Sequence, residues 1–137
     1  MIIEPPLFDE VHLNLRYGVI EHKATHLHWD FRLEKNGTVK DFVFHRAPDP
    51  RLGFEQVITQ LKDHPYYSLS AKTIKERGFL GDTTVKTWDE GRYDIVDWTD
   101  DLIIIEIRVD KLFGLFQLIR KNPTHKPNLW WFSKIDD

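Results

Sequence analysis

The histidines are the first residues in this sequence whose spacing suggests chemistry. Four of the seven lie at positions 22, 26, 28 and 45, close to a carboxylate and an arginine. His28 and Asp30 are two residues apart, so on a β-strand their side chains point the same way, roughly 6.5–7 Å apart at Cα. An imidazole nitrogen and a carboxylate oxygen so placed can bind one divalent ion of the manganese, iron or zinc group. His22 precedes a short Lys23-Ala24-Thr25 bend and can fold back as a third ligand, which would leave open positions for catalysis.

A hairpin must position this strand. Asn36-Gly37 favours a two-residue type I′ turn, because that turn needs positive φ at both central positions. The turn pairs Lys35 with Thr38, so residues whose numbers sum to 73 face each other. Side chains alternate between the two faces of a strand. The face expected to pack on the core carries Leu27, Trp29, Phe31 and Leu33 opposite Arg46, Phe44, Phe42 and Lys40. The other face carries His28, Asp30, Arg32 and Glu34 opposite His45, Val43, Asp41 and Val39.

The polar face of the hairpin has two interpretations. Outward-facing strand positions are commonly solvated and a His-x-Asp pair arises often by chance, so the first interpretation is a solvent-exposed face that binds no metal. The convergence of imidazoles, carboxylates and the guanidinium of Arg32 favours a metal site instead. His26 is an alternative ligand, but we expect it to be a surface residue, as we do for His12 and His125.

Two features outside the hairpin bear on function. His64 is followed by Pro65, which restricts it to an extended conformation. It is therefore either a loop histidine at a strand end or an imidazole aimed into a site. The stretch Leu129-Trp130-Trp131-Phe132 near the end of the chain is rich in aromatics. Exposed aromatics can stack on bases, but alternation favours a last barrel strand that buries part of this stretch.

Composition limits the function classes. The 137 residues fit one domain, and 41% hydrophobic residues with 13% aromatics exclude a disordered tail. Without cysteine there can be no disulfide scaffold, zinc ribbon or thiol nucleophile. No apolar run is long enough to span a membrane, and the acidic, proline-broken start is not a secretory signal, so we expect a cytoplasmic protein. The net charge of −3 means that any nucleic-acid role must rest on a local basic patch or a metal.

Short alternating runs predict a mainly β fold. Turn signals occur at Asn36-Gly37, Glu90-Gly91 and Asn122-Pro123. The segment from Phe54 to Leu61 is ambiguous, since its apolar spacing favours a helix and its β-branched residues favour a strand. The expected strands are Tyr17–His22, Leu27–Glu34, Thr38–Arg46, Thr83–Trp88, Gly91–Asp94, Leu102–Arg108, Leu115–Arg120 and Trp130–Lys134. Eight strands in one domain suggest a closed or nearly closed antiparallel barrel.

Several motifs together resemble the 3′-phosphoesterase domain of bacterial DNA ligase D, which also occurs as a stand-alone protein. The most specific block is His22, five residues ending in Leu27, and then His28-Trp29-Asp30-Phe31-Arg32-Leu33-Glu34. The other motifs follow in the family's order: Arg16 to Glu21, Asp63-His64-Pro65, Thr84 to Gly91, Leu115 to Arg120 and Trp130 to Lys134. The resemblance covers residues 16 to 134, so we expect one such domain over 1–137, with 1–15 as an N-terminal extension.

The resemblance implies a small closed antiparallel β-barrel of about eight strands with short flanking helices. It implies a Mn²⁺ site, with other divalent metals as alternatives, that has His22, His28 and Asp30 as ligands. Arg32 and His64 would hold the scissile phosphate, and Arg46, which stands where the family carries a lysine, would be a third catalytic residue. The implied reaction removes a 3′-terminal ribonucleoside and then the 3′-phosphate, to leave a 3′-hydroxyl. The implied partners are DNA or RNA-tailed DNA 3′ ends, with a DNA ligase and end-joining proteins as further candidates, and we expect a monomer.

The sequence also departs from the family pattern. Lys62 replaces an acidic residue and Ser68 replaces a tyrosine, although Tyr67 lies one position early. The stretch from Ile74 to Asp82 lacks the family's Pro-Glu-Gly. These changes leave the metal ligands intact and bear on phosphate handling. The resemblance further favours a strand over Val57–Asp63.

Two alternative functions remain open from the residues alone. The first is a cupin-like Fe(II) oxygenase, because two histidines and a carboxylate also form the iron facial triad. The second is a catalytically silent barrel that binds nucleic acid or protein. Hydrolysis of a 3′-phosphorylated oligonucleotide would separate the phosphoesterase from both.

Overall fold

β-strands form all of the regular secondary structure in the part of the chain that the structure describes. The computed structural model describes residues 11–65, 74–78, 81–108 and 111–137. The strands are β1 (Leu15–Lys23), β2 (Leu27–Lys35), β3 (Thr38–Phe44), β4 (Glu55–Gln60), β5 (His64–Pro65), β6 (Ile74–Gly78), β7 (Gly81–Trp98), β8 (Leu102–Ile107), β9 (Gly114–Ile119) and β10 (Leu129–Asp136). These ranges contain no helix, so none there could cross a membrane, and the expected flanking helices have no counterpart in them.

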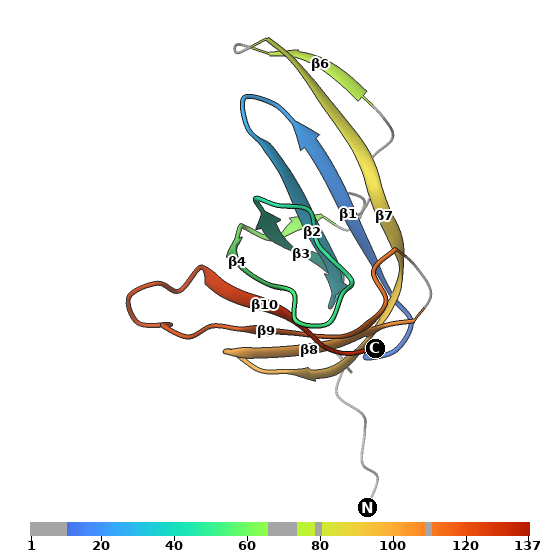
Figure 1. Cartoon of the computed structure of the whole chain (residues 1–137), viewed down its shortest axis with the longest axis vertical. Coiled ribbons are helices and arrows are strands. Elements are labelled where there is room, and N and C mark those ends of the chain that lie inside the picture. Colours follow the sequence, from blue (N-terminus) through green and yellow to red (C-terminus); the bar gives the residue numbers. More distant parts are fainter. Residues whose placement is uncertain (1–10, 66–73, 79–80, 109–110) are drawn as a thin grey trace, which may run out of the picture.

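Eight of the strands close into an antiparallel barrel. Their hydrogen-bonded order is β1-β2-β3-β4-β10-β9-β8-β7, and β7 pairs in turn with β1. The two remaining strands lie outside this ring, since β6 pairs with β7 and β5 pairs with β3. In Figure 1 the long strands β1, β2 and β7 rise together toward β6, while β8, β9 and β10 lie at the other end. The predicted closed barrel is therefore confirmed.

The β2–β3 hairpin has the predicted turn and register. Asn36 and Gly37 both have positive φ, at 52° and 77°. Trp29 pairs with Phe44 and Lys35 with Thr38, as the sum rule requires. β3 ends at Phe44, two residues before the predicted end, and residues 45–46 form a bend.

Aromatic side chains fill the barrel interior. Phe132 packs edge-on against Phe44 at a ring-centroid distance of 4.8 Å and stacks on Phe116 at 5.3 Å. Phe31 contacts the same ring at 6.0 Å. All four phenylalanines are fully buried, and so is Trp130 at 2% exposure. The predicted last strand and most of the predicted core face of the hairpin are thus part of the core, whereas Leu27 and Arg46, at the open end of that face, are exposed.

The segment from Phe54 to Leu61 is a strand, so the helix favoured by its apolar spacing is wrong. β4 pairs with both β3 and β10, which satisfies its backbone hydrogen bonds on two sides. Gln56 and Ile58 are buried, whereas Val57 is exposed. This period-two burial is that of a strand, and tertiary pairing outweighs a helical spacing of four residues. β4 ends at Gln60, short of the predicted Asp63.

Glu90-Gly91 is not a turn, and the two strands predicted on either side of it are one. β7 runs for 18 residues from Gly81 to Trp98. Its register shifts opposite Val19/Ile20 and again between Ile95 and Asp97. Such bulges bend a strand and increase its twist, which lets one strand follow the curve of the barrel wall. Gly91 lies inside the ladder as the partner of Tyr17.

Candidate active site

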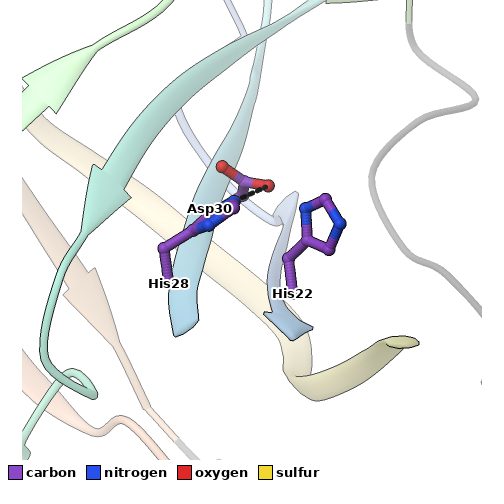
Figure 2. Close-up of side chains that lie close together, drawn as sticks. All are labelled: His22, His28 and Asp30. Carbon is purple, nitrogen blue, oxygen red and sulfur yellow. Dashed lines mark ion pairs between the residues drawn. The ribbon is translucent and has the colours of Figure 1, made fainter. Parts of the chain in front are cut away.

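The β1–β2 hairpin brings three of the predicted site residues together. His22 on β1 and His28 on β2 are direct cross-strand partners, with ring centroids 4.7 Å apart. Asp30 follows two residues later on β2, so its side chain leaves the same face of the strand as His28. Figure 2 shows the three side chains converging from the two adjacent strands.

The donor set and its spacing fit a divalent ion. One ligand atom from each of His22, His28 and Asp30 lies within 4.8 Å of the others. His28 Nε2 is 3.8 Å from Asp30 Oδ2. First-row divalent ions such as zinc bind imidazole nitrogen and carboxylate oxygen at about 2.0–2.2 Å, so two ligands of one ion lie up to about 4.4 Å apart. The His28–Asp30 distance is inside this limit, and the 4.8 Å bound on the whole set lies slightly beyond it. Asp30 is buried while the two histidines are half-buried, so the cluster is held in place yet remains reachable.

Arg32 lies next to the carboxylate of this cluster. Arg32 follows Asp30 by two residues on the same face of β2, and its Nη2 is 3.7 Å from Asp30 Oδ2. Its Nε is 3.5 Å from Asp41 Oδ2 on β3, where Asp41 is its direct cross-strand partner. The guanidinium therefore lies between two carboxylates, only one of which belongs to the histidine cluster.

Asp41 connects Arg32 to His64. β5 pairs with β3 so that His64 faces Val39, and His64 Nε2 lies 2.7 Å from Asp41 Oδ2. The Asp41 side chain is fully buried, and its Oδ1 has no hydrogen-bond partner among the described residues. Burial, and then the nearby Asp30 charge, raise the pKa of Asp41 to about 6, although Arg32 and His64 oppose the rise. The site thus contains a second carboxylate, which holds its proton more tightly than an exposed one does.

Sequence reasoning missed the part that Asp41 plays. The hairpin register already placed Asp41 opposite Arg32, so the pairing of a carboxylate with a guanidinium was the available signal. Its contact with His64 depends on β5, a strand of two residues that no periodicity reveals.

The other predicted residues lie apart from this cluster. Arg46 is exposed in the bend after β3, and its backbone N–H donates to Gln56 Oε1 at 3.1 Å. Among the ion pairs of the described residues none joins Arg46 to Asp30 or Asp41, so its catalytic role stays a prediction. Lys62 is exposed, and Ser68 lies outside the described residues. His12, His26 and His125 are exposed, as predicted. His45 is exposed as well.

Comparison with known proteins identifies the family of this chain. The family described as the DNA ligase D 3′-phosphoesterase domain matches residues 20–120, which include all three residues of the histidine cluster and also Arg32, Asp41 and His64. The chain belongs to the DNA ligase D 3′-phosphoesterase domain family. The resemblance seen in the sequence motifs is therefore correct.

Curated relatives of this 3′-phosphoesterase domain are much longer proteins. The multifunctional non-homologous end joining protein LigD of Pseudomonas aeruginosa is 30% identical over 128 residues, which are 90% of this chain and 15% of that protein. The protein of the same name from Mycobacterium bovis is 27% identical over 110 residues, covering 77% of this chain and 14% of the relative. The one from Mycolicibacterium smegmatis is 26% identical over 118 residues, covering 78% and 16%. The chain therefore spans only about 15% of the length of the first of these relatives, and membership of the 3′-phosphoesterase domain family supports a hydrolase.

Proposed function

We propose that this chain is a metal-dependent phosphoesterase that trims 3′ ends of nucleic acids during DNA repair. It would remove a 3′-terminal ribonucleoside to leave a 3′-phosphate, and then remove that phosphate to leave a 3′-hydroxyl. Each step adds water across one P–O bond. The observation that carries the proposal is one continuous group of side chains, in which Asp30 of the histidine cluster touches Arg32 and Asp41 joins Arg32 to His64.

His22, His28 and Asp30 would hold the ion, for which we propose Mn²⁺. When bound, such an ion neutralises phosphate charge and lowers the pKa of a bound water. Two neutral imidazoles and one carboxylate leave a divalent ion with net positive charge, which suits an anionic substrate. This local charge is what a chain of net charge −3 needs in order to handle phosphate.

Arg32 and His64 would grip the scissile phosphate. A guanidinium can donate two parallel hydrogen bonds to phosphate oxygens. His64 Nε2 faces Asp41, so its Nδ1 is the nitrogen left to face substrate. In the protonated imidazole Nε2–H donates to Asp41 while Nδ1–H can be given to the leaving oxygen. Asp41 is in this scheme a positioning residue that selects which nitrogen of His64 acts.

The test uses two DNA primers with Mn²⁺. One primer ends in a single ribonucleotide and the other ends in a 3′-phosphate. The first should shorten by one nucleoside and the second should lose phosphate, both resolved on a denaturing gel. If the protein processes neither primer with Mn²⁺ or with other divalent ions, the hydrolase proposal fails and a silent nucleic-acid-binding barrel replaces it.

The ligand set has its own test in metal binding. His28→Ala should weaken Mn²⁺ binding at least tenfold in a calorimetric titration, because one of three ligands is removed. The fold should persist, since His28 is half-buried on the face away from the aromatic core. His26→Ala is the matched control, because His26 is exposed two residues away. Equal Mn²⁺ affinity in His28→Ala and the parent would show that this ligand assignment is wrong.

A further inference from the structure

A second polar cavity lies at one end of the barrel, away from the histidine cluster. Its volume is about 370 Å³. Its walls come from β2, β3, β4, β7, β8 and β10, from the β7–β8 connection and from the residue that follows β9. The lining residues are Lys35, Lys40, Gln60, Trp98, Thr99, Asp100, Ile103, Arg120 and Trp130. We call this cavity the barrel mouth.

Cations dominate the charge of the barrel mouth. Lys35 Nζ lies 5.1 Å from the ring centroid of Trp98. The Arg120 guanidinium lies 4.6 Å from the centroid of Trp130. Lys40 also lines the cavity, so among the lining residues that the structure describes there are three cations and one carboxylate, that of Asp100. Aromatic faces favour nearby cations and hold them in fixed positions.

Hydrogen-bond donors are also in excess there. Trp130 Nε1–H donates to Gln60 Oε1 at 2.9 Å, which leaves the Gln60 amide NH₂ as the free polar group. Arg120 Nε is buried and has no hydrogen-bond partner among the described residues. Lys40 donates one hydrogen bond to Asp63 at 2.7 Å and keeps two further N–H donors. An oxyanion with several acceptor oxygens matches this set.

We propose that the barrel mouth binds a phosphate group. In a nucleic-acid end-processing enzyme, which rests on the function proposed above, the source would be a backbone phosphate upstream of the 3′ end. Free inorganic phosphate, a product of the second step, offers the same chemistry. Because the whole chain carries net charge −3, a built cationic cavity is the kind of local basic site that a nucleic-acid role requires.

The distance between the histidine cluster and the barrel mouth determines how long an oligonucleotide must be to contact both. Lys35 follows His28 by seven residues along β2, which corresponds to about 23 Å. Phosphates of one helically stacked strand are about 3.4 Å apart along the axis, so the span equals about seven stacked nucleotides. A trinucleotide held at the histidine cluster therefore cannot reach the barrel mouth, whereas a 12-mer can.

Binding can be followed at the tryptophan side chains, since Trp98 and Trp130 line the cavity and Trp29 and Trp88 do not. In a nuclear magnetic resonance titration of the full chain with inorganic phosphate, the indole N–H signals of Trp98 and Trp130 should shift. Arg120→Gln should weaken that binding about three- to fivefold, the loss typical of one exposed ionic contact. Lys121→Gln is the matched control, because Lys121 lies over Trp131 and outside the cavity.

The source of the phosphate is decided with two oligonucleotides, a trinucleotide and a 12-mer, each ending in a 3′-phosphate. With Mn²⁺, Arg120→Gln should raise KM for the 12-mer and leave KM for the trinucleotide and kcat unchanged. For 12-mer binding, the slope of log affinity against log salt concentration should be shallower by about 0.7 in Arg120→Gln than in the parent, as for one lost single-strand phosphate contact. A phosphate-induced shift without any 12-mer effect would assign the site to free phosphate.

The failure of this proposal is separable from that of the function. If the protein hydrolyses neither oligonucleotide, the indole shifts still report phosphate and 12-mer binding on their own. If Trp98 and Trp130 respond to neither ligand, or if Lys121→Gln weakens binding as much as Arg120→Gln, the phosphate site is disproved even in an active enzyme. Lys35→Gln tests the same cavity should Arg120→Gln fail to fold.

Discussion

Asp41 is the residue whose environment is least ordinary for its type. Its carboxylate is fully buried between a guanidinium and an imidazole. His22, His28 and Asp30 could be singled out from the sequence, because one hairpin contains all three. The role of Asp41 could not, since it rests on a contact that a two-residue strand provides. Arg46 shows the opposite case, in which a family position was assigned a role that no ion pair of the described residues supports.

The buried Asp41 predicts a pH-dependent stability. Its pKa is raised from 3.8 to about 6 in the folded chain, chiefly by burial. The folded state therefore binds the proton more tightly, and the associated stability is fully present below pH 3.8 and lost as the pH rises through about 6. Two units correspond to about 3 kcal/mol at most. Between pH 4 and 7.5 the free energy of unfolding of the parent should fall relative to Asp41→Asn.

Urea denaturation of the metal-free parent and of Asp41→Asn across this pH range measures that difference. Titrations common to both chains cancel in the comparison. A difference that stays constant, or that grows in favour of the parent as the pH rises, would contradict the assignment of a raised pKa to Asp41.

The elements show where local signals suffice and where they do not. The β2–β3 register followed from Asn36-Gly37 alone, because a type I′ turn leaves one pairing. β4 was ambiguous because its pairing partners, β3 and β10, are what make it a strand. β7 was divided at Glu90-Gly91 because a turn dipeptide inside a long strand looks the same as one between two strands. Its two bulges are set by the barrel and not by a local motif.

The hairpin register predicts a large effect at Phe31. This side chain is fully buried and contacts the rings of Tyr17, Phe44 and Phe132 at centroid distances of 6.1, 5.9 and 6.0 Å. Phe31→Ala should lower the free energy of unfolding by about 3–5 kcal/mol in urea denaturation, through lost burial and the cavity left behind. Leu27→Ala on the same strand is the control, because Leu27 is 39% exposed. A loss below about 1 kcal/mol at Phe31 would mean that this face is not a packed core.

At the scale of the whole molecule, the closed barrel separates the candidate active site from the barrel mouth. The histidine cluster lies on β1 and β2, and the Arg32–Asp41–His64 group lies on β2, β3 and β5; on β2 and β3 both use the face opposite the aromatic core. The barrel mouth is lined by residues of six of the eight barrel strands, and no sequence window contains more than a few of its residues. This is why the fold class and the convergence of His22, His28 and Asp30 were predictable from the sequence, whereas the barrel mouth required the assembled barrel.

The compactness of the ligand set along the chain has a consequence for how the protein folds. His22 to Asp30 spans nine residues, and one antiparallel hairpin brings the three side chains together. Closing the barrel instead joins β1 to β7, for example Leu15 to Tyr93, and such a pairing costs far more loop-closure entropy. Contacts of low sequence separation form faster than distant ones. The group of His22, His28 and Asp30 is thus the part of the site with the lowest contact order, and a newly made chain would already contain both of its strands long before β7 had been synthesised.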